Sequence, residues 1–380
     1  MAINRRKFVV GSSLAVASAA AISSGAAPAL ATPRERHILP IGQPVPPPQE
    51  ADFVGVTFSQ RPTASARIRF TSGTSAGEWI PVRPTSHSPD FQPYGTAADL
   101  VPIPPECTSI EIENDDVFAA ATPVAISGLR DATSPLYQTV DLFSFPVITR
   151  AGWGAEESLG RRPSGVLRWS PSFATPQIIT VHHSAIGTAR NAAATVRGIH
   201  RYHAATLGWG DIGYHLLIDP GGLIYAGRST GDLQSPVFSG SGPSLDQLVV
   251  GGHAYAFNEG NLGICLLGDF TSRAPTQAAR ETLIAVLTEL CRALNIDPLG
   301  QTSYTNPGTG ATALVWSVAQ HRELNSTSCP GDAVAMDFRD IRAAVAQRLN
   351  SGVAPAHNAA GVVPASTTVA EVIPVEIQDV

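Results

Sequence analysis

The sequence predicts an α/β protein, with a mixed central β-sheet flanked by helices and a small all-β, sandwich-like domain in front of it. Short segments that alternate apolar and polar residues occupy the range 50–131, whereas the range 145–350 mixes continuous apolar runs with apolar residues at helical spacing. With 380 residues and a hydrophobic fraction of 43%, the chain is long enough to bury two cores.

Residues 1–31 have the pattern of an export signal. Three cations, including the pair Arg5-Arg6, precede a mildly apolar run rich in Ala, Ser and Gly, and Ala29–Ala31 suits signal cleavage. The arginine pair is typical of a twin-arginine signal, the route for cargo that folds before export. An uncleaved membrane anchor is the alternative, although the Ser and Gly content disfavours hydrocarbon. We expect a secreted or cell-envelope protein with no stable membrane span after cleavage.

The charge of the chain argues against nucleic acid as a partner. The formal net charge is −6, and removing residues 1–31 with their three cations makes it −9. Lys7 is the only lysine, so every cation of the mature chain is an arginine, and these arginines form no basic stripe. An anionic polymer would therefore have to be bound locally.

Two interruptions divide the rest of the chain into parts. Residues 32–49 are rich in proline and predict an extended linker. The range 50–131 predicts a β-rich N-terminal domain, because Gly, Pro and Ser turns separate its alternating segments. A second break at Ser134-Pro135 precedes the main domain, 145–350. Residues 351–380 have no usable periodicity and predict a disordered tail.

The main domain predicts strands and helices in mixed order. Gln177–His183 is a buried strand that ends in two histidines, and Leu262–Leu267 is a second interior strand. Asp219–Gly222 predicts the turn of a hairpin. Helices are expected near 191–206, after Thr276 as an N-cap, and after Pro330. Together these elements predict a mixed sheet wrapped by helices.

The four cysteines are too few for a disulfide scaffold: Cys107, Cys265, Cys291 and Cys329. Cys265 lies in an apolar strand and Cys291 on a predicted helix. The two could form a bridge if that helix packs on the sheet.

A histidine and a cysteine eight positions apart, His321 and Cys329, lie in a polar loop. Zinc accepts imidazole nitrogen and thiolate sulfur, and a catalytic zinc site has three protein ligands and an open fourth position. His182 at the end of its strand would complete such a set. His183 points to the opposite face, so the two cannot both reach one metal. The alternative is that Cys329 is half of a disulfide and His321 a surface residue.

Four motifs occur in an order that resembles one family: Val181–Ala185, Gly208–His215, Tyr225–Arg228 and His321–Gly331. The chain is similar to the peptidoglycan recognition protein and type 2 N-acetylmuramoyl-L-alanine amidase family over roughly residues 146–350. The resemblance implies the type 2 amidase fold and one Zn²⁺ per chain, held by His182, His321 and Cys329. It also assigns Tyr214 and Thr327 to the catalytic shell and places His253 along the substrate groove.

The resemblance implies hydrolysis of the amide between the lactyl group of N-acetylmuramic acid and L-alanine of peptidoglycan. Members that only bind the cell wall usually lack the cysteine ligand, so Cys329 favours catalysis. In this interpretation Tyr214 donates to the developing oxyanion and Thr327 holds the water or the product. Tyr214 as an ordinary strand aromatic and Thr327 as a loop-capping hydroxyl are the alternatives. A non-hydrolytic peptidoglycan-binding protein and a structural envelope protein remain as other functions.

Arg228 has two possible roles. It can neutralise a buried carboxylate, or it can bind a stem-peptide carboxylate as a substrate-binding residue. Ala226 stands where relatives commonly carry Glu, which puts an inherited ion pair in doubt. We expect peptidoglycan as the partner and a monomeric chain.

Overall fold

The computed structural model describes residues 37–351, except 65, 83, 117, 129–137, 188–190, 233–234 and 240–244. The expected export signal and residues 32–36 of the expected linker therefore lie outside the described residues. So does the expected tail after Ser351. All described residues belong to one compact unit, Glu35–Val380. Within the described ranges, no helix is long and apolar enough to cross a membrane.

The N-terminal part consists of two antiparallel sheets. One has the order β1 (His37–Ile38), β8 (Ala121–Ile126), β2 (Phe53–Phe58) and β6 (Val101–Pro102). In the other, β3 (Ala66–Ser72) pairs with β4 (Ser75–Ala76), β5 (Ile80–Val82) and β7 (Ser109–Asn114). Alternate side chains of both sheets, among them Val54, Val56, Ile68 and Ile110, form one hydrophobic cluster. The all-β character predicted from alternation is confirmed.

The main sheet has seven strands and is mixed. Its order is β19 (Val318–Gln320), β12 (Ile178–His183), β16 (Asn261–Leu266), β13 (Leu216–Ile218), β14 (Ile224–Ala226), β10 (Phe145–Ile148) and β9 (Thr139–Leu142). β12 is parallel to both of its neighbours, whereas β13 and β14 form the predicted antiparallel hairpin. Every residue of β12 and β16 is buried, which explains why both read as continuous apolar runs.

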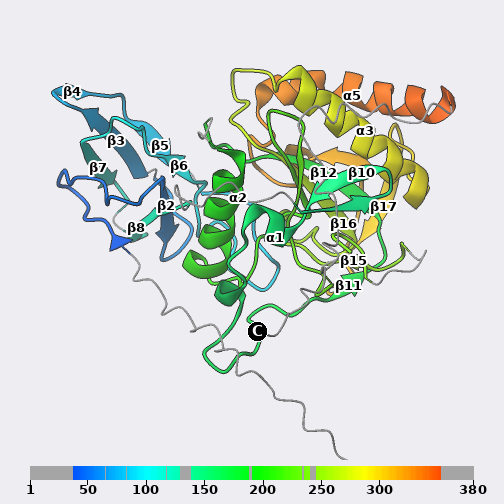
Figure 1. Cartoon of the computed structure of the whole chain (residues 1–380), viewed down its shortest axis with the longest axis horizontal. Coiled ribbons are helices and arrows are strands. Elements are labelled where there is room, and N and C mark those ends of the chain that lie inside the picture. The colour runs from blue at the N-terminus through cyan, green and yellow to red at the C-terminus, as the bar shows by residue number, and fades with distance from the viewer. Residues whose placement is uncertain are drawn as a thin grey trace, which may run out of the picture. The chain divides into compact units, whose positions relative to one another are not determined.

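Helices cover both faces of this sheet (Figure 1). On one face, α3 (Gln277–Leu294) and α5 (Asp332–Ser351) bury Leu283, Leu287 and Phe338 against the strands. On the other face lie α1 (Arg150–Trp153) and α2 (Ala192–Arg201), which continues into a π-helical turn (Tyr202–Thr206). A short 3₁₀ helix follows α1 (Glu157–Gly160). The predicted N-cap is confirmed, because Thr276 accepts a hydrogen bond from the Ala279 amide at 3.1 Å.

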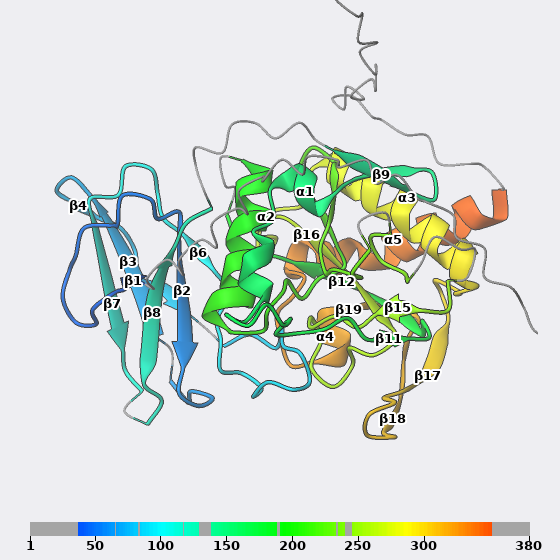
Figure 2. The ribbon, with the colours of Figure 1, turned by 60° about the horizontal axis from the view of Figure 1, so that its bottom comes forward.

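Smaller elements complete the domain. β11 (Phe173–Ala174) pairs with β15 (Leu248–Val249), and β17 (Gln301–Thr305) forms a hairpin with β18 (Thr312–Trp316), as Figure 2 shows. The last short helix is α4 (His321–Leu324). These elements are too short to leave a periodic pattern in the sequence.

The suggested bridge between Cys265 and Cys291 does not exist, because both side chains are free thiols. Cys265 packs in the cluster beneath α2, and Cys291 in the cluster beneath α3. The helix does pack on the sheet, as required, but Cys265 points to the opposite face by strand alternation.

Candidate metal centre

Strand β12 directs one histidine to each face of the mixed sheet. The His182 side chain is fully buried, and its ring lies 5.4 Å from the ring of Tyr214. His183 points the other way, where its Nδ1 accepts a hydrogen bond from the Phe270 amide at 3.2 Å. The predicted division between the two histidines is confirmed, and only His182 faces the donors described below.

A tight turn brings His321 and Cys329 next to β12. β19 runs parallel to β12 and leads directly into α4, which begins at His321. A capping box formed by Gln320 and Glu323 fixes the start of this helix. The chain then returns so that the Arg322 amide donates to the carbonyl oxygen of Cys329 at 2.9 Å. Both donor side chains are buried.

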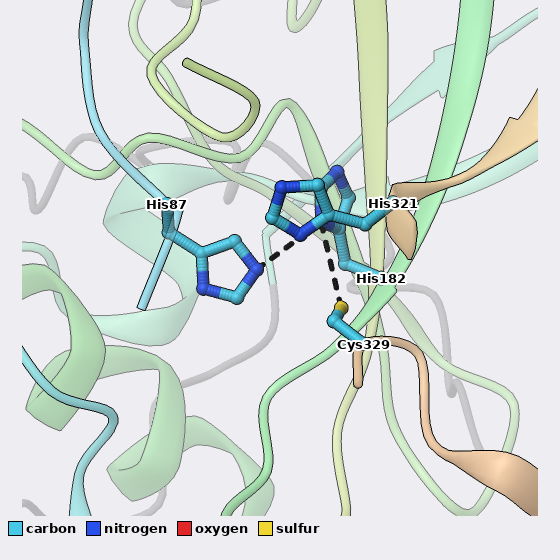
Figure 3. A group of neighbouring side chains, drawn as sticks. All are labelled: His87, His182, His321 and Cys329. Carbon is cyan, nitrogen blue, oxygen red and sulfur yellow. Dashed lines mark hydrogen bonds between the residues drawn. The ribbon is translucent and has the colours of Figure 1, made fainter. Parts of the chain in front are cut away.

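A fourth donor, His87, comes from the β-rich part of the chain. It lies in the loop of residues 84–100 between β5 and β6, which Figure 2 shows in cyan, passing below α2 toward α4. His87, His182, His321 and Cys329 each offer one ligand atom, and these atoms all lie within 4.8 Å of one another (Figure 3). Sequence analysis missed His87, because a single histidine 95 residues before His182 and outside the resemblance carries no signal.

Two distances between donor atoms match those of tetrahedral zinc, and the whole group lies within 4.8 Å. Bonds of about 2.0 Å to nitrogen and about 2.3 Å to sulfur place two nitrogens about 3.3 Å apart and nitrogen and sulfur about 3.6 Å apart. Nε2 of His87 lies 3.3 Å from Nδ1 of His182, and Sγ of Cys329 lies 3.7 Å from that same nitrogen. Imidazole and thiolate are ligands that zinc prefers, so both the chemistry and the spacing of this set fit zinc.

A hydrogen-bond chain orients Nδ1 of His182 toward the other donors. Nε2 of His253 lies 3.0 Å from the carbonyl oxygen of Asn261, which can only accept, so this nitrogen carries the hydrogen. In the neutral ring, Nδ1 of His253 is then an acceptor, and it lies 2.9 Å from Nε2 of His182. The lone pair on Nδ1 of His182 is left for a metal, in the manner of histidine ligands held by a second hydrogen bond.

His253 therefore supports a ligand. In this structure it does not line a groove, the position that the resemblance implied. Its ring is fully buried behind His182 and packs directly on β16, where a Cβ added to Gly263 would lie 2.6 Å from it. In this structure strand packing leaves no solvent-facing side to the ring, and the expected groove position of His253 stays a prediction.

His321 supplies an independent indication of a ligand. Its Nδ1 is buried and has no hydrogen-bond partner among the described residues. Its Nε2 lies 3.1 Å from Oδ1 of Asn325, an acceptor, which places the ring hydrogen on Nε2 and the lone pair on Nδ1. Buried polar atoms are nearly always paired, so an orphaned imidazole nitrogen among three other donors fits a metal ligand.

Burial keeps His182, His321 and Cys329 neutral. It lowers the pKa of His182 and of His321 well below the usual value, and the neighbouring imidazoles lower both further. Burial also raises the pKa of the Cys329 thiol. Neutral imidazole is the form that binds metal, whereas the thiol has to lose its proton. A divalent cation among the donors supplies the positive charge that stabilises the thiolate.

The two residues assigned to the catalytic shell differ in position. The Tyr214 hydroxyl lies 3.3 Å from Nδ1 of His87, and burial raises the pKa of Tyr214 well above its usual value, so the phenol keeps its proton. The Thr327 hydroxyl accepts a hydrogen bond from the Cys329 amide at 3.2 Å. This contact is the loop-capping role, and it helps to hold the turn that carries Cys329.

Arg228 neutralises a buried carboxylate. Its Nη1 lies 2.9 Å from Oδ2 of Asp211, and its guanidinium stacks 3.8 Å from the ring of Trp169. Only 2% of Arg228 is exposed, which favours the first of its two expected roles, the neutralisation of a buried carboxylate. Asp211 supplies the carboxylate that Ala226 cannot provide to Arg228. Arg150 binds the same carboxylate at 2.9 Å.

Comparison with known proteins identifies the family. Residues 172–332 match the family described as N-acetylmuramoyl-L-alanine amidase. The chain is 32% identical over 123 residues to the endolysin of enterobacteria phage T3, an alignment that covers 30% of this chain and 68% of the endolysin.

The chain belongs to the N-acetylmuramoyl-L-alanine amidase family. His182, His321 and Cys329 all lie within the matched range of the family, whereas His87 precedes it. The family indicated by the four sequence motifs is confirmed.

Other members are longer or more distant. The chain is 28% identical over 190 residues to the human N-acetylmuramoyl-L-alanine amidase. This alignment covers 49% of this chain and only 26% of the human protein. The Drosophila peptidoglycan recognition protein SD is 22% identical in a structural comparison that covers 51% of this chain and 94% of that chain, with a TM-score of 0.35.

Proposed function

We propose that this chain is a zinc-dependent N-acetylmuramoyl-L-alanine amidase. It hydrolyses the amide between the lactyl group of N-acetylmuramic acid and L-alanine of the peptidoglycan stem peptide, with one Zn²⁺ per chain. The observation that carries the proposal is the convergence of His182, His321 and Cys329 within the range that matches the amidase family.

The three residues act as the zinc ligands. A bound zinc ion supplies Lewis acidity, which activates water and polarises a carbonyl oxygen. The ligand nitrogens are oriented without a bound metal, because His253 fixes the tautomer of His182 and Asn325 fixes that of His321. Such preorganisation avoids reorientation of the rings during the reaction.

Tyr214 and Thr327 have supporting roles in this proposal. The protonated phenol of Tyr214 donates a hydrogen bond to the substrate carbonyl oxygen as negative charge develops on it. Thr327 keeps the Cys329 turn in place through the Cys329 amide, and its hydroxyl holds water or product at the same edge of the site.

Tyr214→Phe should lower kcat by a factor of about 10²–10³, the usual effect of removing one oxyanion donor, while zinc content stays unchanged. Metal analysis and initial rates on soluble muropeptide check this. The matched control is Tyr304→Phe, which removes a buried hydroxyl bonded to the Glu259 carbonyl oxygen at 3.0 Å, away from the donors. A Tyr214→Phe variant with the wild-type rate would remove Tyr214 from the mechanism.

Mass spectrometry of peptidoglycan fragments tests the activity itself. Purified peptidoglycan is incubated with the chain, with and without a zinc chelator. Release of intact stem peptides with a free alanine amine, abolished by the chelator and restored by Zn²⁺, is the expected result. If zinc is bound but several wall types yield no peptide, the chain is instead a peptidoglycan-binding protein without turnover.

The proposal extends to where the chain works. We place the mature protein outside the cytoplasm or in the cell envelope, exported through the twin-arginine route, because its substrate lies there and residues 1–31 carry that pattern. We also propose a monomer. Sedimentation of the mature chain and detection of the cleaved N-terminus in culture medium test these two points.

A further inference from the structure

Hydrogen-bond partners orient the ring of His87, the fourth donor, as they orient metal-binding histidines. Nδ1 of His87 lies 2.8 Å from the Thr85 hydroxyl and 3.3 Å from a carboxylate oxygen of Asp99. A carboxylate acceptor fixes the ring hydrogen on Nδ1 and leaves the lone pair on Nε2, the arrangement common to zinc-binding histidines. Nε2 is the atom that points at His182, 3.3 Å from its Nδ1, and Figure 3 shows the ring facing the other donors from its own segment.

The loop that carries His87, residues 84–100, is attached at both its base and its tip. At the base, the Ala98 amide donates to the Val56 carbonyl oxygen at 2.9 Å, which ties the loop to β2. At the tip, the Asp90 carboxylate accepts from the Ala256 amide at 2.8 Å and from the Asn258 side chain at 2.6 Å. The tip is bound to the amidase part by these polar contacts, by a hydrogen bond from Asn258 to the Ser88 carbonyl oxygen, and by the ring pairs Phe91–Trp169 and Tyr94–Tyr255.

The same loop contacts other parts of the centre. The Ser86 hydroxyl lies 3.1 Å from Nε2 of His321, and the rings of His87 and His321 stack with centroids 4.6 Å apart. The Tyr214 hydroxyl lies 3.3 Å from His87 rather than facing open space. The loop thus fills the fourth donor position. It also contacts the Tyr214 hydroxyl, which the proposed mechanism needs.

We propose that His87 is a fourth zinc ligand and that the 84–100 loop is an inhibitory plug. The inference rests on the proposed metal site and names its regulation. Three imidazoles and one thiolate fill a tetrahedral zinc, and a filled site has the composition of a structural centre, whereas a catalytic centre keeps one position open for water. Hydrolysis requires the tip of the loop to leave, which withdraws His87 and frees Tyr214.

The structure shows where withdrawal is least costly. A hollow of about 170 Å³ lies beside His87, lined by both arms of the loop and by Thr206, Leu207 and Trp209. Withdrawal has to break the polar contacts of Ser86, Ser88 and Asp90 and the ring contacts of Phe91 and Tyr94, while the base can stay paired with β2. Separating the tip therefore leaves the hydrophobic clusters of both parts intact.

The first test counts zinc ligands in the full mature chain. Zinc X-ray absorption should show three imidazoles and one sulfur in the wild type, and two imidazoles, one sulfur and an oxygen in His87→Ala. With Co²⁺ in place of zinc, azide should change the visible spectrum of His87→Ala and leave that of the wild type unchanged. His37→Ala, the same replacement at an exposed histidine, should behave as wild type.

The second test releases the plug without touching a ligand. Asp90→Ala removes the two hydrogen bonds of the Asp90 carboxylate at the tip and keeps His87, so its Co²⁺ form should become sensitive to azide. If the open state is a minor one, both Asp90→Ala and His87→Ala should hydrolyse muropeptide about tenfold faster than wild type, or more. Thermal unfolding of each apo variant confirms that the fold is kept.

The outcomes separate this inference from the proposed function. A wild-type centre with two imidazoles and an azide response would overturn the plug, even if the chain is an active amidase. A closed wild-type centre that opens in both variants without any hydrolysis would support the plug and reject the amidase. Loss of hydrolysis in His87→Ala with zinc retained would make His87 a catalytic residue, which also overturns the plug.

Discussion

His182→Ala should weaken zinc binding sharply and abolish peptidoglycan hydrolysis. Nδ1 of His182 lies 3.3 Å from Nε2 of His87 and 3.7 Å from Sγ of Cys329. Its loss therefore removes the middle of the ligand set. Removing a residue that only supports a ligand commonly costs about 10–100-fold in metal affinity, and removing the ligand itself should cost more than that. Hydrolysis should fall to the background level.

The measurement does not depend on activity alone. A ligand that binds only the folded state raises the unfolding temperature, so Zn²⁺ should stabilise the wild type far more than His182→Ala. The matched control is His183→Ala on the same strand. His183 accepts a hydrogen bond from Phe270 on the other face, so this variant should lose stability yet keep the zinc response. Equal zinc responses in His182→Ala and wild type would reject the proposed centre.

Asp211→Asn should lower the free energy of unfolding by about 3–5 kcal/mol, the range found when one partner of a buried ion pair is removed. Asp211 is 4% exposed and binds Arg150 and Arg228, each at 2.9 Å. Burial alone would raise the pKa of Asp211, but the two guanidinium groups outweigh it and hold the pKa below its usual value. The neutral amide would remove the countercharge of Arg228 and, among the described residues, leave Arg150 with Glu157 alone.

Urea unfolding of the apo protein measures this effect. The control is Asp337→Asn, which removes a carboxylate bound to Arg280 at 2.5 Å on the surface, where both side chains are about one-third exposed. Surface pairs contribute about 0–1 kcal/mol, so this variant should stay close to wild type. Similar losses in the two variants would show that the Asp211 cluster has no special role in stability.

Local patterns account for the parts of the fold that the sequence predicted correctly. The strand Ile178–His183 is buried on both faces, and that burial requires the continuous apolar run that identified it. Thr276 caps α3 through a contact three residues away, which a sequence pattern records directly. The turn between β13 and β14 was readable for the same reason.

Contacts between distant segments account for the errors. The bridge between Cys265 and Cys291 required a helix to pack on the correct face, and the face was not readable from spacing. Arg228 and His253 were given substrate roles because the resemblance supplied their positions without their burial. In the structure both are buried partners of other residues, Asp211 and His182, which for Arg228 is the first of the two roles left open by its sequence.

The sequence by itself determined the family, the mixed sheet with an all-β part in front, and three of the four donors, because His182 ends a recognisable strand and His321 and Cys329 share one loop. Only the tertiary structure decided that His87 joins them. Its loop crosses from the β-rich part to a site formed 95 residues later in the chain, and no local pattern encodes which distant side chain meets a donor. That meeting depends on how the β-rich part packs against the amidase part, where Phe53 and Leu100 share one hydrophobic cluster with Val196.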